Sequence, residues 1–305
     1  MTGERELTGA LRSFFGSSRG VLVPLGDDAA VVRSPKGGLV LCCDPVVEGV
    51  HFLADTPLSL VGRKAVNRNL SDLAAMGAAA RWLLCSVVAP KDFGRARLLK
   101  VLGGVRAAAR AAGATVVGGD VAAAAGPLVV TISAVGEAPP QPLRRDALRI
   151  GDTLHVTGPL GGSIAGHHLR FRPALREGRW LAQQAGVRAA IDVSDGLLLD
   201  LQTMLAASGG YGAELASAAI PVRAAATRLS GGAVDRALDR ALRDGEDHCL
   251  LFSVQRGAAL PKGGPLTQRA RRPIGQVVAA PGITIVDGAE RRRVEAAGFE
   301  HRIAP

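Results

Sequence analysis

Six aspartates stand in short apolar or glycine-flanked segments rather than on charged surfaces. They are Asp28 in LGDDAAVV, Asp44 in LCCDPV, Asp72 in NLSDLAAMG, Asp120 in VVGGDVA, and Asp192 and Asp195 in AIDVSDGL. An ionised carboxylate close to a core is costly unless it is paired or binds a metal ion. Proteins hold Mg²⁺ with one or two carboxylates together with substrate phosphates. The six aspartates together predict a site that binds several Mg²⁺ ions and handles phosphate groups.

Each aspartate also has a structural interpretation when it is taken alone. The GDD and GGD segments are common turn sequences, in which Asp accepts a hydrogen bond from its own backbone. Asp72 could belong to a helix face, and Asp195 could cap a helix that starts at Gly196. The metal interpretation therefore depends on the occurrence of all these segments in one chain.

Other chemical motifs carry less information. GPLGGSIAG at 158–166 lacks the GK[ST] of a P-loop and departs from GxGxxG, which favours an ordinary strand-to-helix turn. His51 in EGVHF follows Asp44 closely, although a lone histidine is usually a hydrogen-bonded structural residue. We expect His167 and His168 on an exposed helix. No GxSxG or HExxH occurs, so neither a serine hydrolase nor a zinc peptidase is supported.

The elements that must position these residues alternate between strands and helices. The pattern predicts helices over 58–76 and 95–112, each ended by a glycine, between short apolar strands. The proline-rich, charged segment around 138–146 interrupts this order, and the alternation then starts again. We therefore expect an α/β or α+β fold with two domains, 1–140 and 141–305.

Composition excludes several classes of protein. The net charge is +10, but only five of the 37 basic residues are lysines and the arginines are scattered, so a nucleic-acid interface is not expected. A basic surface can instead attract small anionic substrates. The four cysteines show no metal-binding spacing and fit a reducing cytoplasm. No apolar run is long enough to span a membrane.

Seven segments occur in an order that resembles a known family. They are GDDAAVV, CDPVVEGVHF, GRKAVNRNLSDLAAMGA, GGD with PLVVTISAVGEA, RRDALRIGDTLHVTGPLGGSIAG, IDVSDGL and DGEDHCLLF. This pattern resembles the thiamine-monophosphate kinases of the PurM-like superfamily, from about residue 20 to about residue 300. The joint presence of EGVHF, NLSDLAAMG and IDVSDGL makes the resemblance specific.

The resemblance implies a PurM-like two-domain architecture and an activity. The N-terminal sheet domain would pair across a homodimer, the C-terminal domain would be α/β, and ATP would bind in a cleft between the domains. The γ-phosphoryl group of ATP would pass directly to thiamine monophosphate. Such a transfer needs mainly alignment and neutralisation of charge, which carboxylates and Mg²⁺ can supply.

The resemblance also implies roles for individual residues. The expected metal ligands are the six aspartates and the positions of two cysteines: Asp28, Cys42, Cys43, Asp44, Asp72, Asp120, Asp192 and Asp195. The expected ATP-binding residues are Gly119, Asp120, Arg145 and Ser194. The expected substrate-binding residues are His51, Glu246 and Phe299. Phe299 could stack on a ring of the substrate or could belong to the core.

The chain departs from the family pattern at five positions. Cys42 and Cys43 stand where Ser or Thr is usual, and a thiol is a poor ligand for Mg²⁺. Asp244, His248 and Cys249 replace residues of the usual GGEDYEL segment beside Glu246. Two alternatives therefore remain open: a paralogue that binds nucleotide or thiamine phosphates without turnover, and another PurM-like ATP-dependent enzyme with a different acceptor, such as relatives of aminoimidazole-ribotide synthetase or hydrogenase-maturation proteins.

Overall fold

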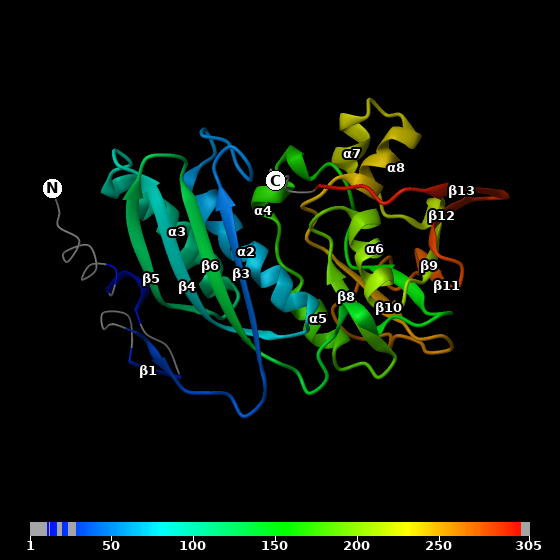
Figure 1. The fold of residues 1–305 in the computed structure, drawn as a ribbon, viewed down its shortest axis with the longest axis horizontal. Helices are drawn as coiled ribbons and strands as arrows, with labels where there is room; N and C mark the ends of the chain where they lie inside the picture. The colour runs from blue at the N-terminus through cyan, green and yellow to red at the C-terminus, as the bar shows by residue number, and fades with distance from the viewer. Residues whose placement is uncertain (1–10, 12, 17–19, 24–28, 300–305) are drawn as a thin grey trace. The chain divides into compact units, whose positions relative to one another are not determined.

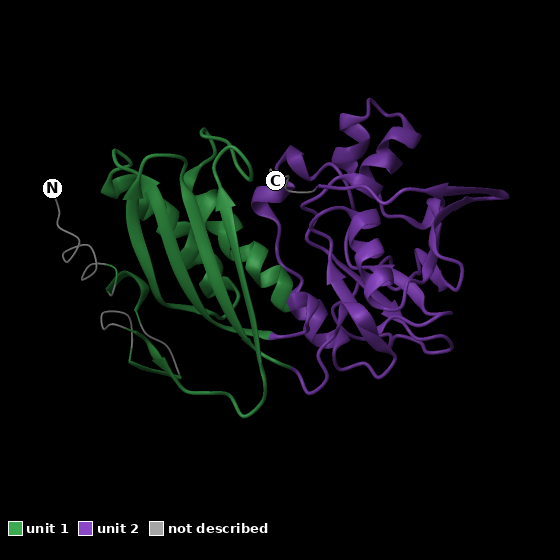
Figure 2. Cartoon of the chain, in the orientation of Figure 1, with its two compact units in different colours: residues 1–73, 79–138 green, residues 74–78, 139–305 purple. Residues whose placement is uncertain are grey.

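The computed structural model describes residues 11, 13–16, 20–23 and 29–299. They belong to two compact units, unit 1 from residues 1–73 and 79–138 and unit 2 from residues 74–78 and 139–305 (Figure 2). Asp28, one of the expected metal ligands, lies outside the described residues. The mixture of sheets and helices confirms the expected α/β (α+β) class.

Unit 1 is built on a four-stranded sheet in the order β3-β6-β4-β5. Its strands are β3 (Leu39–Val47), β4 (Ala79–Pro90), β5 (Thr115–Ala124) and β6 (Val129–Glu137). β4 and β5 are parallel and the other neighbours are antiparallel. Two further short strands, β1 (Val21–Val23) and β2 (Val31–Val32), pair with each other. β3 therefore lies at an edge of the main sheet, with Asp44 in its second half.

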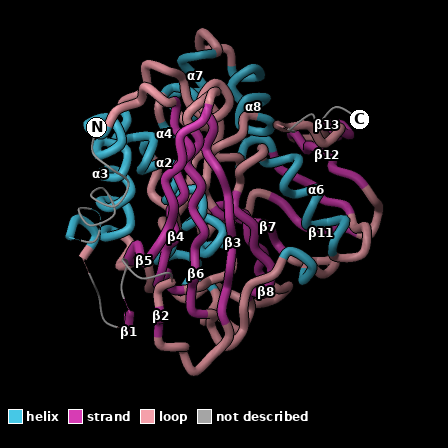
Figure 3. Tube along the Cα trace, turned by 60° about the vertical axis from the view of Figure 1, so that its left-hand side comes forward, coloured by secondary structure: helices cyan, strands magenta, loops and turns pink. Residues whose placement is uncertain are grey.

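Helices α2 (Leu58–Ala75) and α3 (Arg95–Ala111) lie against one face of this sheet (Figure 1 and Figure 3). The two helices approach each other closely at glycines. A Cβ added at Gly62 would lie 2.0 Å from the carbonyl oxygen of Val101, and one at Gly104 would lie 2.0 Å from that of Ser59. Any larger residue at these two positions would push the helices apart.

Unit 2 contains a seven-stranded sheet in the order β13-β12-β9-β11-β7-β10-β8. Its strands are β7 (Thr153–Val156), β8 (Val187–Asp192), β9 (Gly212–Ala216), β10 (Leu250–Val254), β11 (Gly275–Val278), β12 (Gly282–Asp287) and β13 (Glu290–Val294). All neighbours are antiparallel except β9 and β12. β8 ends at Asp192, so its carboxyl end leads directly into the predicted DVSDG segment.

The helices of unit 2 are short. They are α4 (His167–Arg170), α5 (Leu175–Leu181), α6 (Leu197–Ala207), α7 (Ala224–Leu229) and α8 (Val234–Arg243), with 3₁₀ turns at Arg145–Ala147, Ser163–Ala165 and Ser217–Ala219. Leu201 and Met204 of α6 are fully buried in one apolar cluster, and Leu181 and Phe252 belong to a second. None of the helices in the described part of the chain is long and apolar enough to cross a membrane.

Candidate active site

Asp44 is held by a side chain from helix α2. Its backbone N–H donates to Oδ1 of Asn69 at 2.9 Å, and Nδ2 of Asn69 donates to the carbonyl oxygen of Asp44 at 3.2 Å. Nδ2 also donates to the carbonyl of Ala65 at 3.0 Å, and Asn69 is fully buried. The Asn69 amide thus contacts both main-chain groups of Asp44, as a neighbouring strand would. Arg68 places its Nε 3.6 Å from the carboxylate of Asp44.

Cys42 lies on the same face of β3 as Asp44, because side chains two apart on a strand point the same way. Its thiol donates to the carbonyl oxygen of Asn69 at 3.3 Å. Burial, followed by the nearby charges of Asp72 and Asp44, raises the pKa of the Cys42 thiol far above its usual range. The structure therefore brings Asp44, Asp72 and Cys42 together, with the cysteine as a protonated thiol.

Cys43 points to the opposite face of β3. It is exposed, and its sulfur accepts a hydrogen bond from the hydroxyl of Ser133 on β6 at 3.2 Å. The structure does not bring its side chain to Asp44. Strand alternation thus separates the two cysteines that the family pattern groups together.

His51 follows β3 and is buried. Its Nδ1 accepts a hydrogen bond from the N–H of Val47 at 3.1 Å, which leaves the ring proton on Nε2. The ammonium of Lys64, which is fully buried in α2, donates to the carbonyl oxygen of His51 at 2.6 Å. These two contacts fix both the backbone and the ring of His51. Neither Lys64 nor Asn69 was identified from the sequence, because their partners His51 and Asp44 lie 13 and 25 positions away in the chain.

Gly119 and Asp120 lie on β5, away from Asp44. In register, Asp44 is opposite Ile132, Ile132 is opposite Cys85, and Cys85 is opposite Gly119. Three strand spacings separate the two sites, roughly 14 Å at ~4.8 Å each. Gly119 has φ 151°, and a Cβ there would lie 1.8 Å from the Cys85 carbonyl oxygen. The close approach of β4 thus requires glycine at this position.

Four predicted residues of unit 2 meet at the turn after β8. The carbonyl oxygen of Ser194 accepts a hydrogen bond from the N–H of Glu246 at 2.7 Å. The carbonyl oxygen of Asp195 accepts one from the N–H of Phe299 at 2.9 Å. Phe299 is 48% exposed, so its ring is open to a ligand rather than buried in the core. Backbone contacts therefore join three segments that are far apart in the sequence.

Three carboxylates crowd together beside this turn. Oδ2 of Asp200 accepts hydrogen bonds from the N–H groups of Asp195 at 3.0 Å and Gly196 at 3.2 Å. Burial, together with the charges of Asp192 and Asp195, raises the pKa of Asp200 to about 8. Its place in the first turn of a predicted helix was the signal that could have identified Asp200. A cation bound here would relieve this repulsion between the carboxylates.

His248 contacts Asp192 from the neighbouring loop. Its Nδ1 lies 3.3 Å from Oδ2 of Asp192, and its ring stacks on Phe171 with centroids 4.1 Å apart. Among the described residues, no three His, Cys, Asp or Glu side chains are grouped so that they alone could hold a metal ion. A Mg²⁺ ion bound here would therefore take further oxygen ligands from phosphate groups.

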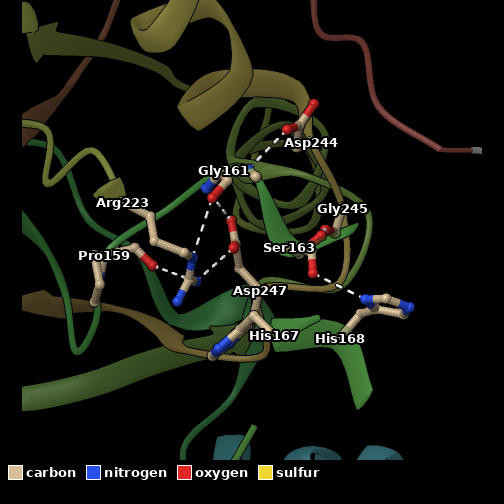
Figure 4. A network of polar contacts seen from close by, with 10 residues as sticks. Pro159, Gly161, Ser163, His167, His168, Arg223, Asp244, Gly245 and Asp247 are labelled. Atoms are coloured by element: carbon tan, nitrogen blue, oxygen red, sulfur yellow. Dashed lines mark hydrogen bonds and ion pairs between the residues drawn. The ribbon is translucent and has the colours of Figure 1, made fainter. Parts of the chain in front are cut away.

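The glycine-rich turn at 158–166 is occupied by the chain's own carboxylates (Figure 4). The N–H of Gly161 donates to Oδ2 of Asp247 at 2.7 Å, and that of Gly162 donates to Oδ2 of Asp244 at 2.8 Å. The hydroxyl of Ser163 donates to the carbonyl of Gly245 at 2.6 Å. These amides are satisfied within the protein, which agrees with an ordinary turn rather than a phosphate loop.

The same network corrects the expectation of an exposed helix at His167 and His168. Both residues are half-buried in the single turn α4. Nε2 of His167 lies 2.9 Å from the carbonyl oxygen of Asp247, and Nδ1 of His168 lies 2.9 Å from that of Ser163. The expectation was wrong because a four-residue helix is too short to show a polar face in the sequence.

Arg145 begins the 3₁₀ turn after the segment that joins the two halves of the sequence. Its side chain is exposed, and its carbonyl oxygen accepts a hydrogen bond from the hydroxyl of Ser208 at 3.1 Å. The neighbouring Arg144 forms the ion pair with Asp146. The backbone of Arg145 is thus anchored while its guanidinium faces solvent.

Comparison with known proteins shows which family the chain belongs to. Residues 26–138 match the family model described as AIR synthase related protein, N-terminal domain. The chain is 37% identical to thiamine-monophosphate kinase of Rhodopirellula baltica over 296 residues, which cover 92% of each protein. The chain belongs to the thiamine-monophosphate kinase family. The thiamine-monophosphate kinase of Escherichia coli K12 is 33% identical, again over 92% of each protein.

Solved structures of thiamine-monophosphate kinases share the fold. The enzyme from Stenotrophomonas maltophilia superposes with a TM-score of 0.77 at 29% identity, covering 90% of this chain and 93% of that one. A protein named AaThiL, solved in complex with AMPPCP and TMP, superposes with a TM-score of 0.76 at 27% identity. The match covers 98% of this chain and 97% of that one. The hydrogenase-maturation protein HypE of E. coli superposes with a TM-score of 0.75, but at 21% identity it shares the fold alone. The resemblance of the sequence to thiamine-monophosphate kinases is confirmed.

Proposed function

We propose that this protein transfers the γ-phosphoryl group of ATP to thiamine monophosphate, giving thiamine diphosphate and ADP. The observation that carries the proposal is the 37% identity to a thiamine-monophosphate kinase over 92% of both chains. The likeness to a relative bound to TMP and AMPPCP, an ATP analogue, supports the choice of both substrates.

Several Mg²⁺ ions would be held by carboxylates of both units. Asp44 and Asp72 would serve in unit 1, together with Asp120 on β5, and Asp192 and Asp195 would serve in unit 2. When bound, Mg²⁺ neutralises negative charge on the phosphates and so favours phosphoryl transfer. In unit 1, Asn69 and Arg68 fix Asp44, so its carboxylate is positioned before any ion arrives.

The chain's other residues would bind and orient the two substrates. On the ATP side, the exposed guanidinium of Arg145 is suited to a bidentate contact with a phosphate. Gly119 in unit 1 and Ser194 in unit 2 would each contribute from its own unit. On the acceptor side, His51 would contribute its imidazole, Glu246 its carboxylate, and Phe299 an exposed ring that can stack on an aromatic heterocycle. No covalent intermediate on the protein is required.

We also propose a homodimer formed through unit 1. The face of the sheet opposite α2 carries exposed apolar side chains, with Leu39 at 48%, Leu41 at 68% and Leu84 at 44% exposure. Cys43 on β3 and Ser133 on β6 share this face. A second copy of the sheet would remove this apolar surface, and the free edge of β3, from water.

The cytoplasm is the proposed location. All four cysteines are free in the structure, and two of them are buried. Free thiols of this kind persist in a reducing compartment. The same compartment contains the ATP that the reaction uses.

The test is an assay of ADP release by the purified protein with ATP and Mg²⁺, with and without thiamine monophosphate. We expect release that depends on thiamine monophosphate and is lost in Asp72→Asn, which removes a charge from the metal site with little change of volume. The surface variant Asp239→Asn is the matched control and should retain activity. Binding of thiamine monophosphate without ADP release would support the non-catalytic paralogue, and release stimulated by a different acceptor would support another PurM-like enzyme.

A further inference from the structure

Glu246 and His248 are the non-glycine residues with left-handed backbone among those described, with φ of 59° and 48°. This conformation is unfavourable for a residue that has a Cβ. It persists where the surroundings impose it, and such positions gather at functional sites. The two residues flank Asp247, so the contacts that hold Asp247 constrain the backbone on either side of it.

Asp247 is held from three directions (Figure 4). Its side chain is completely buried. Oδ2 accepts a hydrogen bond from the N–H of Gly161 at 2.7 Å, and Oδ1 accepts one from Nη2 of Arg223 at 2.7 Å. The carbonyl oxygen of Asp247 lies 2.9 Å from Nε2 of His167. Asp247 therefore cannot turn without breaking several buried hydrogen bonds.

Arg223 joins this loop to the glycine-rich turn. Its Nη2 also donates to the carbonyl oxygen of Pro159 at 2.6 Å, and its Nε donates to that of Gly161 at 3.1 Å. One planar guanidinium thus bonds three acceptors on two segments, with only 15% of the side chain exposed. A lysine ammonium at the same place cannot reproduce this fork of donors.

The other side of the loop rests against the end of β8. The N–H of Glu246 donates to the carbonyl of Ser194 at 2.7 Å, and the N–H of His248 donates to that of Val193 at 2.8 Å. The loop is therefore fixed between Arg223 on one side and the DVSDG turn on the other. These contacts constrain the backbone of Glu246, and with it the direction of its Cα–Cβ bond, before a ligand binds.

We propose that Arg223 is a positioning residue for the phosphoryl acceptor: it fixes Asp247, and through Asp247 it holds Glu246 in the left-handed conformation that binds thiamine monophosphate. This inference rests on the proposed function, in which Glu246 binds the acceptor. Arg223 acts through its neighbours and is not a catalytic residue.

The first test is a kinetic comparison of Arg223→Lys with the natural protein. We expect the KM for thiamine monophosphate to rise at least about tenfold, while the KM for ATP changes by less than about twofold and kcat at saturation is largely kept. Asp247→Asn, which retains the size but loses an acceptor for the Gly161 N–H, should change the same constants in the same direction. Arg243→Gln is the control, because it removes only the surface ion pair with Asp239.

The second test needs no turnover. Hydrogen exchange of the Glu246 and His248 amides should be at least about tenfold faster in Arg223→Lys, with the amides of β10 unchanged. A folded variant with a normal KM for thiamine monophosphate, an equal rise in both KM values, or unchanged exchange would each overturn the inference. If Arg223→Lys does not fold, Asp247→Asn is judged by the same criteria. A natural protein inactive with thiamine monophosphate contradicts the proposed function instead, and the exchange measurement still decides on Arg223.

Discussion

Asn69 shows how one amide can organise a carboxylate that lies on a separate element. Its side chain contacts the N–H and the carbonyl of Asp44 as well as the carbonyl of Ala65. These contacts fix the strand backbone at the residue that is expected to bind metal. Stability and metal affinity should therefore change together when Asn69 is altered.

We expect Asn69→Leu to lower the free energy of unfolding by about 3 kcal/mol, since the buried Asn69 side chain loses three hydrogen bonds at about 1 kcal/mol each. The Mg²⁺ concentration for half-maximal ADP release should rise as well. Urea unfolding and a Mg²⁺ titration measure the two effects. The control is Gln276→Leu, because that amide makes a single exposed contact with Glu214. Equal stabilities of the two variants would contradict the role of Asn69.

The sequence could predict the aspartates but not the residues that hold them. Asp44 and Asp192 stand out because a carboxylate in an apolar segment needs a physical reason. Asn69 and Arg223 have ordinary local contexts, and the aspartates that they contact, Asp44 and Asp247, lie 25 and 24 positions away in the chain. Contacts at such separations depend on the tertiary fold, which local patterns do not contain.

At the scale of elements, the approach of β5 to β4 depends on Gly119. The Cβ of an alanine there would lie 1.8 Å from a backbone oxygen that belongs to a paired strand and cannot move alone. We expect Gly119→Ala to cost about 3 kcal/mol of stability, at the upper end for overpacking. Gly103→Ala on α3 is the control. No atom lies within 4 Å of its Cβ, so it should be neutral or slightly stabilising.

β7 contributes a sensitivity to acid through His155. Burial lowers the pKa of this histidine from 6.5 to about 4, while Nδ1 bonds the carbonyl of Ala270 and Nε2 lies 2.9 Å from the Thr153 hydroxyl. The unfolded chain binds the proton near pH 6.5 and the folded one near pH 4. The contribution of His155 to the free energy of unfolding is therefore fully present above pH 6.5 and is lost as the pH drops from 6.5 towards 4.

The loss through His155 should reach about 3 kcal/mol near pH 4, at 1.36 kcal/mol per pKa unit. His155→Gln keeps a donor and an acceptor but does not titrate, so it should reduce the slope of stability against pH in this window. Chemical unfolding at pH 7.5, 6, 5 and 4 measures the slope. If the free energy of unfolding changes with pH equally in the variant and in the natural protein, His155 is not the source of the acid sensitivity.

The limits of the two long helices followed from local signals. The predicted helix 58–76 is observed as Leu58–Ala75, because the apolar periodicity covers five turns and Gly77 accepts φ 71° at its end. The predicted helix 95–112 is observed as Arg95–Ala111. The segment 74–78 joins unit 2 although its sequence neighbours lie in unit 1, and no local pattern reveals this.

At the scale of the whole molecule, the proposed dimer makes a direct prediction about mass. Light scattering at micromolar concentration should give twice the chain mass of 31.3 kDa. Leu41→Glu places a charge on the exposed face of β3 and should shift the population to monomer with little effect on the fold. Leu229→Glu, at an exposed leucine of unit 2, is the control. A natural protein of 31.3 kDa would exclude a stable dimer.

The alternation of side chains between the two faces of β3 also makes one cysteine selectively accessible to chemical labelling. Cys43 is exposed, whereas burial raises the pKa of Cys85 to about 12 and, with neighbouring carboxylates, also raises the pKa values of Cys42 and Cys249. A maleimide dye at neutral pH should therefore react at one thiol of the four. Because Cys43 lies on the face proposed to pair, its labelling should be slow at high protein concentration and rapid on dilution. The labelling rate of Cys43 in the natural protein would thus report on dimer formation.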